Sequence, residues 1–297
     1  MKASEILGGD PVIESSIGAM RRHFEQNTAL WWDDFFSRPD ELPDGFGLFG
    51  TSSYLFRCSG AAFLVDPCFR DPAWGEPLAG RIAADLEKLD GIILTHEHID
   101  HCDPSFIRMA AGAKVRWYVP DFFSFKELHR LGLSPESIVP VRSDDRVTLG
   151  GCTLRFFESN HRNEGWTSFV REYGFCLTCG EKNYIFPGDV RDYDPTFYPA
   201  LPDADVLFAH LWLGKAQALS PPWEPKLTEF CRFILSFRPR AVTLAHLYEV
   251  AREPEELWSW QHAGAVADRL FALSPETSLT VPRPGRWYSF DRLQDTL

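Results

Sequence analysis

The densest cluster of metal-binding side-chain types lies at residues 95–103, which read Thr95-His96-Glu97-His98-Ile99-Asp100-His101-Cys102-Asp103. This segment directly follows residues 91–95, a short apolar run typical of a buried strand. A loop at the end of a strand is where a rigid scaffold presents reactive groups. Neutral imidazoles and carboxylates are ligands for zinc and similar divalent metals. We therefore interpret the segment as a metal site and not as a chance histidine-rich surface loop.

Three further candidate ligands lie downstream, each just beyond a predicted strand. The pairs of strand and ligand are 153–157 with His161, 184–186 with Asp189 through a Pro-Gly pair, and 241–245 with His246. Each residue alone could be an ordinary core or loop side chain. Their shared position at the carboxyl end of a strand indicates one common site.

The pattern of apolar runs and turn residues predicts hairpins followed by helices. We expect hairpins of 54–57 with 61–65, 147–149 with 153–157, and 174–178 with 184–186; further strands at 114–119, 206–209 and 278–289; and helices at 81–89, 227–237 and 254–273. A further helix should begin at Asp103-Pro104, an N-cap followed by proline. This order favours two sheets covered on the outside by helices.

Length and composition place the chain among globular proteins. Its 297 residues are 44% hydrophobic, which allows a sizeable core, and its net charge of −12 argues against non-specific nucleic-acid binding. Seven scattered cysteines in a chain of this size suit a reducing compartment, and no stretch is long and apolar enough to span a bilayer. We therefore expect a cytoplasmic protein.

Residues 1–45 differ in character from the rest of the chain. Aromatic residues at helical spacing beside acidic ones, at 30–36, indicate an amphipathic helix that packs on something. We expect residues 1–45 to form an N-terminal extension docked on a main domain of residues 46–297. A lid over a site and a dimer contact are the alternatives, and a homo-oligomer is left open.

The chain resembles the metallo-β-lactamase-fold superfamily of metallohydrolases. The match to its signature is His96-x-His98-x-Asp100-His101, and the later ligand positions match in order at His161, at Asp189 within Pro-Gly-Asp, and at His246. Residues 48–55, leading to 64–67, resemble the entry strands of one branch. That branch holds ascorbate-6-phosphate lactonase-like proteins and the N-acyl-phosphatidylethanolamine phospholipase D type. The resemblance implies an α+β fold, a four-layer αββα sandwich.

The same resemblance implies a site for two metal ions. Its ligands would be His96, His98 and His161 for one ion and Asp100, His101 and His246 for the other, with Asp189 bridging them. Asp66 would orient the ligand loop by hydrogen bonds or be a plain turn residue. Glu97 occupies a variable position of the signature, and we expect it to point to solvent.

The implied activity is that of a binuclear metallohydrolase. A metal-activated hydroxide would attack a small ester, lactone or phosphodiester, and the substrate could carry a phosphate group. Asp100 would take or relay a proton. Zn²⁺ or Mn²⁺ suits the ligands better than iron. The alternative is a mononuclear iron-dependent oxygenase or dioxygenase on the same fold, held by His96, His98 and His161. A binding module without catalysis is a third reading, which the complete ligand set opposes.

Several residues outside the signature are weaker candidates. His210, at the end of the strand expected at 206–209, could contact substrate or act as a general acid. Other side chains expected to border the cleft are Tyr193, Tyr198, Trp212, Lys215 and Tyr248, and residues 191–223 form the preferred substrate-selecting region. We interpret Cys176 and Cys179 as ordinary buried cysteines, because residues three apart in a strand point to opposite faces. Cys102 is expected to pack as a neutral residue, with a metal contact as its alternative.

Overall fold

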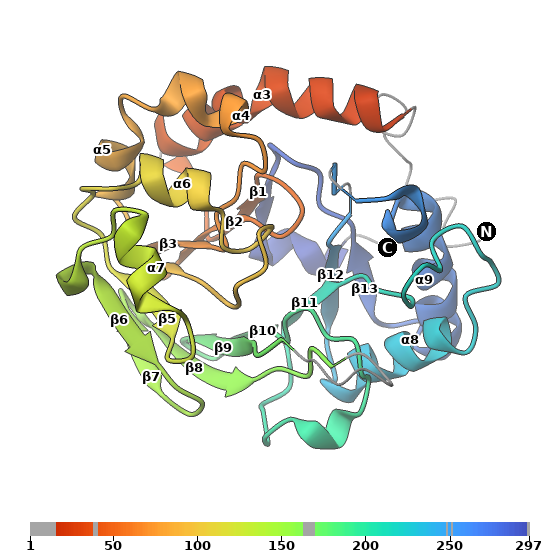
Figure 1. Ribbon diagram of the computed structural model, residues 1–297. Helices are drawn as coiled ribbons and strands as arrows, with labels where there is room; N and C mark the ends of the chain where they lie inside the picture. Colours follow the sequence, from red (N-terminus) through yellow and green to blue (C-terminus); the bar gives the residue numbers. More distant parts are fainter. Residues whose placement is uncertain (1–15, 38–40, 163–169, 248, 251, 296–297) are drawn as a thin grey trace.

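Two mixed β-sheets lie face to face at the centre of the computed structural model (Figure 1). The structure describes residues 16–37, 41–162, 170–247, 249–250 and 252–295. Within these residues the strand order is β14-β1-β2-β3-β4-β5-β6 in one sheet and β13-β12-β11-β10-β9-β8-β7 in the other. Helices cover the outside of both sheets. The predicted α+β, four-layer αββα sandwich is confirmed.

Each sheet begins with antiparallel strands and continues with parallel ones. The first sheet consists of β1 (Gly45–Leu48), β2 (Tyr54–Cys58), β3 (Ala61–Val65), β4 (Gly91–Ile93), β5 (Trp117–Pro120), β6 (Ile138–Val141) and β14 (Trp287–Ser289). The second consists of β7 (Arg146–Leu149), β8 (Cys152–Glu158), β9 (Tyr173–Cys179), β10 (Lys182–Phe186), β11 (Val206–His210), β12 (Ala241–Ala245) and β13 (Ser278–Thr280). The three predicted hairpins are therefore confirmed.

The helices lie on two sides of the pair of sheets. The α-helices are α3 (Ile17–Ser37), α4 (Pro72–Gly75), α5 (Ile82–Leu86), α6 (Pro104–Met109), α7 (Phe125–Arg130), α8 (Lys226–Ser236) and α9 (Trp260–Leu273). Helix α6 begins as predicted, because the Asp103 side chain accepts a hydrogen bond from Ser105 N at 2.8 Å. Among the described residues, no helix combines the length and the apolar composition that crossing a membrane requires.

Aromatic side chains from both sheets form the core between them. Phe56 of β2 meets Phe186 of β10 and Phe208 of β11 with ring centroids 5.1 and 5.2 Å apart, in edge-on geometry. All three rings are almost fully buried. Burying one such side chain contributes about 1.5–3 kcal/mol, so this layer fixes the two sheets against each other.

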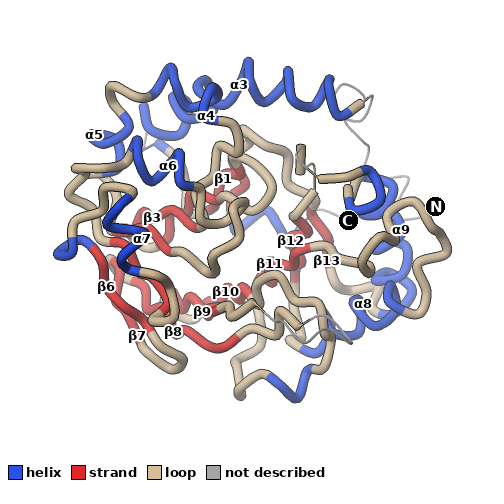
Figure 2. Tube along the Cα trace, in the orientation of Figure 1, coloured by secondary structure: helices blue, strands red, loops and turns tan. Residues whose placement is uncertain are grey.

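Helix α3 packs against the outer face of the first sheet, next to α4 (Figure 2). Its buried residues recur at helical spacing, namely Met20, Phe24, Thr28, Trp31, Trp32, Phe35 and Phe36. The Trp32 ring lies 5.3 Å from that of Phe49, and its Nε1 donates to Asp85 Oδ2 at 2.9 Å. The predicted amphipathic helix is present and is longer than the aromatic run that indicated it.

Two predicted elements near the C-terminus are wrong in extent. The helix expected at 254–273 begins at Trp260, because a capping box at Ser259 starts it and Pro254–Glu256 forms a separate short 3₁₀ helix. The strand expected at 278–289 is two strands, β13 and β14, which belong to different sheets. The segment between them contains Pro282, Pro284 and Gly285, and Gly285 has a φ of +75°. These residues interrupt the strand pattern and let the chain cross between the sheets.

Candidate metal centre

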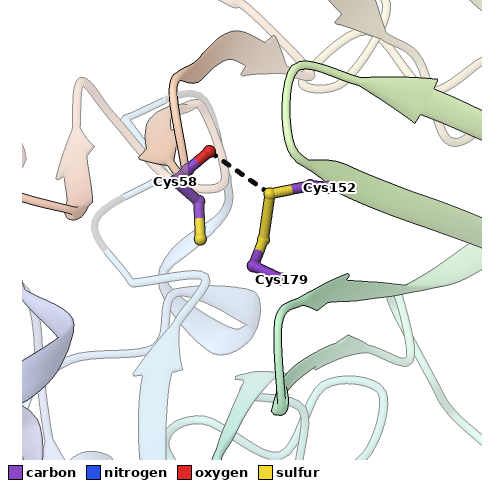
Figure 3. Close-up of side chains that lie close together, drawn as sticks. All are labelled: Cys58, Cys152 and Cys179. Atoms are coloured by element: carbon purple, nitrogen blue, oxygen red, sulfur yellow. Dashed lines mark hydrogen bonds between the residues drawn. A yellow bond between two sulfur atoms is a disulfide. The ribbon is translucent and has the colours of Figure 1, made fainter.

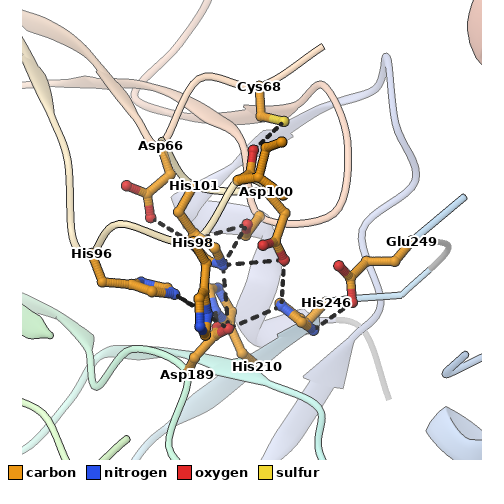
Figure 4. A network of polar contacts seen from close by, with 12 residues as sticks. Asp66, Cys68, His96, His98, Asp100, His101, Asp189, His210, His246 and Glu249 are labelled. Atoms are coloured by element: carbon orange, nitrogen blue, oxygen red, sulfur yellow. Dashed lines mark hydrogen bonds and ion pairs between the residues drawn. The ribbon is translucent and has the colours of Figure 1, made fainter. Parts of the chain in front are cut away.

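The carboxyl ends of several strands from both sheets meet at one edge of the sandwich, and the candidate ligands lie there in two groups. Figure 4 shows His96, His98, Asp100, His101, Asp189 and His246 close together at this edge. The first donor group is His96, His98 and His161. The second donor group is Asp100, His101, Asp189 and His246. In each group one nitrogen or oxygen atom of every member lies within 4.8 Å of the others. The structure thus brings together all seven residues that the sequence predicted as ligands.

The first donor group depends on Glu172, a residue that the sequence analysis did not identify. Its carboxylate lies 3.1 Å from His96 Nδ1 and 3.4 Å from His161 Nδ1. It also accepts a hydrogen bond from Asp189 N at 2.9 Å. Glu172 is fully buried. The carboxylate thus lies at the Nδ1 side of both rings, and on the other side of the His96 ring Nε2 lies 3.0 Å from His98 Nδ1 within the group.

The turn before Asp189 is shaped to admit this carboxylate. Gly188 has a φ of +91°, and a Cβ at this position would lie 2.6 Å from Glu172 Cδ. Any residue other than glycine would displace Glu172 or strain the turn. The Pro187-Gly188 turn therefore places Asp189 and also leaves room for the carboxylate that contacts the first donor group.

The second donor group contains buried polar atoms that have no hydrogen-bond partner among the described residues. These atoms are Asp100 Oδ2, Asp189 Oδ2 and His246 Nε2. Asp189 Oδ2 lies 3.1 Å from His246 Nε2 and 3.2 Å from His101 Nε2, and Asp100 Oδ2 lies 3.6 Å from His246 Nε2. Leaving buried polar atoms unpaired costs about 1–3 kcal/mol each, and more for charged groups. Two carboxylates and two imidazoles around one point are a donor set that fits a divalent cation.

Asp189 connects the two groups. Its Oδ2 lies 4.0 Å from His96 Nε2 of the first group, besides its close contacts within the second. Its other oxygen, Oδ1, lies 2.6 Å from His210 Nδ1. A carboxylate held in this way on one side presents its free oxygen between both groups.

Asp66 supports the ligand loop, as one of the two interpretations of the sequence expected. It accepts hydrogen bonds from Thr95 N at 2.8 Å and Thr95 Oγ1 at 2.7 Å, and it lies 2.7 Å from His101 Nδ1. Its backbone has a φ of +46°, and that of His246 has a φ of +68°. Non-glycine residues held in this region cluster at functional sites.

The pKa values of the histidines differ between the groups. Burial, followed by the nearby His96 and His161, lowers the pKa of His98 to about 3. Burial also lowers the pKa of His246, but the carboxylates of Asp189 and Glu249 outweigh it and raise that pKa to about 9. His98 is therefore a neutral imidazole with a free electron pair, as a metal ligand must be.

Comparison with known proteins identifies the family. Residues 62–247 match the family described as the β-lactamase superfamily domain, which is more than half of the chain. The chain belongs to the β-lactamase superfamily. The more specific resemblance to the lactonase and phospholipase D branch stays a prediction.

Two relatives within the β-lactamase superfamily are similar in sequence. YhfI of Bacillus subtilis is 27% identical over 175 residues, which are 54% of this chain and 64% of YhfI. A metal-dependent hydrolase of Myxococcus xanthus is 29% identical over 113 residues, which are 38% of this chain and 37% of that protein. The chain thus spans less than two thirds of either relative.

Solved structures of the superfamily share the fold. The crystal structure of Bacillus subtilis YhfI superposes with a TM-score of 0.56 at 19% identity, covering 83% of this chain and 96% of YhfI. CmlA from Streptomyces venezuelae, a diiron β-hydroxylase, gives a TM-score of 0.58 at 19% identity, covering 84% of this chain and 54% of CmlA. The likeness to both structures shows the shared fold.

His210 lies beside the second donor group, in contact with Asp189. Its Nδ1 contacts Asp189, and its Nε2 lies 3.2 Å from the Tyr54 hydroxyl. Both ring nitrogens are therefore engaged within the protein. Contact with substrate stays a prediction that this geometry does not favour, because no ring nitrogen is left to donate a proton to a ligand.

The other candidates that the sequence singled out are packing residues or lie apart. The rings of Tyr193 and Tyr198 pack against Phe233 of α8, at 5.5 and 5.4 Å between centroids. Trp212 lies under the Arg191 guanidinium at 5.4 Å. Glu97 is exposed and accepts a hydrogen bond from Ser124 N at 2.9 Å. Burial and, to a smaller extent, the nearby Asp66 raise the pKa of Cys102 to about 12, so its thiol is neutral. Tyr248 lies outside the described residues.

The expectation that Cys176 and Cys179 are ordinary buried cysteines is wrong for Cys179, which is buried but not a simple packing residue. Cys179 forms a disulfide with Cys152, with the two Cα atoms 4.5 Å apart (Figure 3). The register of β8 and β9 places the two residues directly opposite each other, although they are 27 positions apart in the chain. Cys176 stays free and buried, as expected. Cys58 lies close to this disulfide and is a free, buried cysteine.

Proposed function

We propose that the chain is a binuclear metal-dependent hydrolase that acts on a small ester, lactone or phosphodiester. The first donor group would hold one divalent ion and the second donor group another, with Asp189 between them. The three unpaired buried atoms of the second group carry this proposal, because a cation is the partner that would satisfy all of them at once. Zn²⁺ suits the imidazole-rich first group, and Mn²⁺ is the other candidate.

The ions would supply Lewis acidity, which polarises a carbonyl or phosphoryl oxygen and lowers the pKa of water. The chain's own residues keep the donors oriented: Glu172 behind His96 and His161, Asp66 behind His101, and His210 behind Asp189. Asp100 Oδ2 is buried, makes no hydrogen bond to a described residue and lies 3.6 Å from Arg252 Nη2; it would hold or pass on the proton released from the attacking water.

The second donor group distinguishes this proposal from a mononuclear iron oxygenase. An enzyme of that kind needs the three histidines of the first group alone. Here a further pair of carboxylates and a further pair of imidazoles converge within 4.8 Å, buried and oriented by their neighbours. The likeness to CmlA concerns the fold and gives no argument for oxygen chemistry.

Elemental analysis of purified, tag-free protein tests the proposal, together with hydrolysis of a panel of lactones, esters and phosphodiesters. We expect about two equivalents of zinc or manganese per chain and metal-dependent turnover of at least one class. One equivalent of iron with oxygen consumption would overturn the proposal. So would a reloaded protein that binds metal at one group alone. The variant E97Q is the matched control, because Glu97 lies in the signature segment but is exposed and outside both groups.

A further inference from the structure

A small cavity lies beside the second donor group, between the site and the helices α3 and α4. Asp100 and Ser52 line it on the side of the site, and the Ser52 hydroxyl lies 3.4 Å from the ring nitrogens of His101. Phe24 of α3 and Trp74 of α4 line the opposite side, with their rings stacked 5.4 Å apart. The cavity therefore connects the candidate metal centre to the N-terminal helix.

The side chain of Arg70 also lines this cavity. Its Nε is buried and makes no hydrogen bond to any described residue, and its guanidinium forms no ion pair with a described carboxylate. Arg70 is partly exposed, but its buried Nε–H has no acceptor among these residues, and a buried donor left unpaired is costly. An anionic ligand is the partner that would remove this cost.

The backbone at Arg70 is fixed independently of its side chain. Arg70 has a φ of +67°, which L residues rarely adopt. Asp103, the N-cap of α6, holds this conformation by accepting hydrogen bonds from Phe69 N at 3.0 Å and Arg70 N at 3.3 Å. The loop thus positions Arg70 without using its guanidinium, which stays available for another role.

The size of the cavity selects the ligand group. Its volume is about 20 Å³, on a scale where one water needs roughly 10–15 Å³. It therefore admits a group about as large as a carboxylate and excludes an aromatic ring. A guanidinium binds a carboxylate with two parallel hydrogen bonds, and the aromatic wall of Phe24 and Trp74 strengthens that contact by excluding water.

We propose that Arg70 binds a carboxylate of the substrate, so that the scissile bond lies over Asp100 and the donor groups. The inference rests on the proposed hydrolase function and narrows its substrate class to esters or lactones that carry a free carboxylate. It also makes α3, through Phe24, part of the wall of the substrate subsite.

Two variants separate the subsite from the metal centre. R70Q removes the charge and leaves the backbone hydrogen bonds to Asp103 in place. G50A adds a methyl group to the cavity wall, where a Cβ would lie 3.6 Å from Phe24 Cε1 and 4.0 Å from Cys68 O, which are ordinary contacts. G50A therefore fills the cavity without removing any charge, and E97Q again is the control.

The first measurement is of binding and needs no activity. Thermal unfolding of the chelator-treated protein is compared in sodium acetate and in sodium chloride at equal ionic strength. We expect saturating acetate to raise the melting temperature of the wild type and of E97Q by about 2 °C or more. The melting temperatures of R70Q and G50A should be the same in acetate and in chloride. Equal shifts in all four proteins, or none in the wild type, would overturn the inference even if the protein proves to be a hydrolase.

The second measurement uses the metal-loaded protein with p-nitrophenyl butyrate and mono-p-nitrophenyl succinate, whose acyl chains differ only in ending on a methyl group or on a carboxylate. We expect R70Q to raise KM for the succinate ester roughly 10- to 100-fold and to change KM for the neutral ester by less than about twofold. Equal losses on both esters would overturn the inference. If neither ester is hydrolysed while acetate still stabilises the wild type through Arg70, the proposed function fails on these esters and the anion subsite stands.

Discussion

The two donor groups differ in charge and in what supports them. The first consists of three imidazoles with one buried carboxylate, Glu172, behind two of them. The second combines two imidazoles with the carboxylates of Asp100 and Asp189. The pKa values follow this difference, since that of His98 is lowered to about 3 and that of His246 is raised to about 9.

The difference has a physical consequence for metal binding. The first group is formally neutral at its ligand atoms, so its affinity depends on how well the three rings are oriented. In the second group the carboxylates of Asp100 and Asp189 repel each other unless a positive charge lies between them. The field that retains a proton on His246 is the field that attracts a cation.

The largest effect is expected for D189N, which alters a carboxylate of the second group whose Oδ2 also lies 4.0 Å from His96 Nε2 of the first. Under the proposed function Asp189 would serve both ions, and because a neutral amide oxygen binds a divalent cation more weakly than a carboxylate, both sites would be weakened. We expect turnover to fall roughly 10³-fold or more and metal content to fall at both sites. Elemental analysis and kcat/KM measure this. Loss of metal at a single site would show that the two groups do not share Asp189.

The pair E172Q and D66N tests whether the groups are supported separately. Glu172 contacts histidines of the first group, and Asp66 contacts His101 of the second. We expect each variant to weaken metal binding about 10- to 100-fold at its own site and much less at the other. Titration with zinc followed by calorimetry resolves the two sites. E97Q should behave as the wild type, and weakening of the same site by both variants would contradict the separation.

A smaller effect is expected for Y54F, which removes a contact one step behind the second group. Without the hydroxyl, His210 Nε2 is left buried and unpaired. The free energy of unfolding should fall by about 1 kcal/mol and kcat/KM by less than tenfold. Urea unfolding and steady-state kinetics provide the two values.

Y288F is the matched control for this variant. The Tyr288 hydroxyl accepts a hydrogen bond from Arg283 N at 2.8 Å, away from the donor groups. It should cost similar stability and leave kcat/KM unchanged. If Y54F lowers stability alone, as Y288F does, then His210 does not need Tyr54 to orient Asp189.

Much of the site could be predicted because its residues obey one rule. Asp66, His161, Asp189 and His246 each follow a strand that ends at the same edge of the sandwich. Apolar runs and turn residues reveal such strand ends locally, before any tertiary contact is known. The signature at 96–101 then indicates which edge is functional.

Glu172 could not be found by that rule because it precedes a strand. β9 runs antiparallel to β8 and β10, so its first residues lie beside the last residues of those two strands, and Tyr173 pairs with Glu158. The same register brings Cys179 opposite Cys152. Neither relation has a local signal in the sequence, since both depend on how the strands are paired.

Local sequence thus determined the candidate ligands and the strand ends and turns that present them, because these depend on side-chain chemistry and on backbone preferences within a few residues. Tertiary structure alone decided that one carboxylate contacts two histidines, that His210 faces Asp189, and that Arg70 Nε is buried beside the site with no hydrogen-bond partner among the described residues. Such relations join residues far apart in the chain, and the packing of two sheets and α3 sets the distances between them.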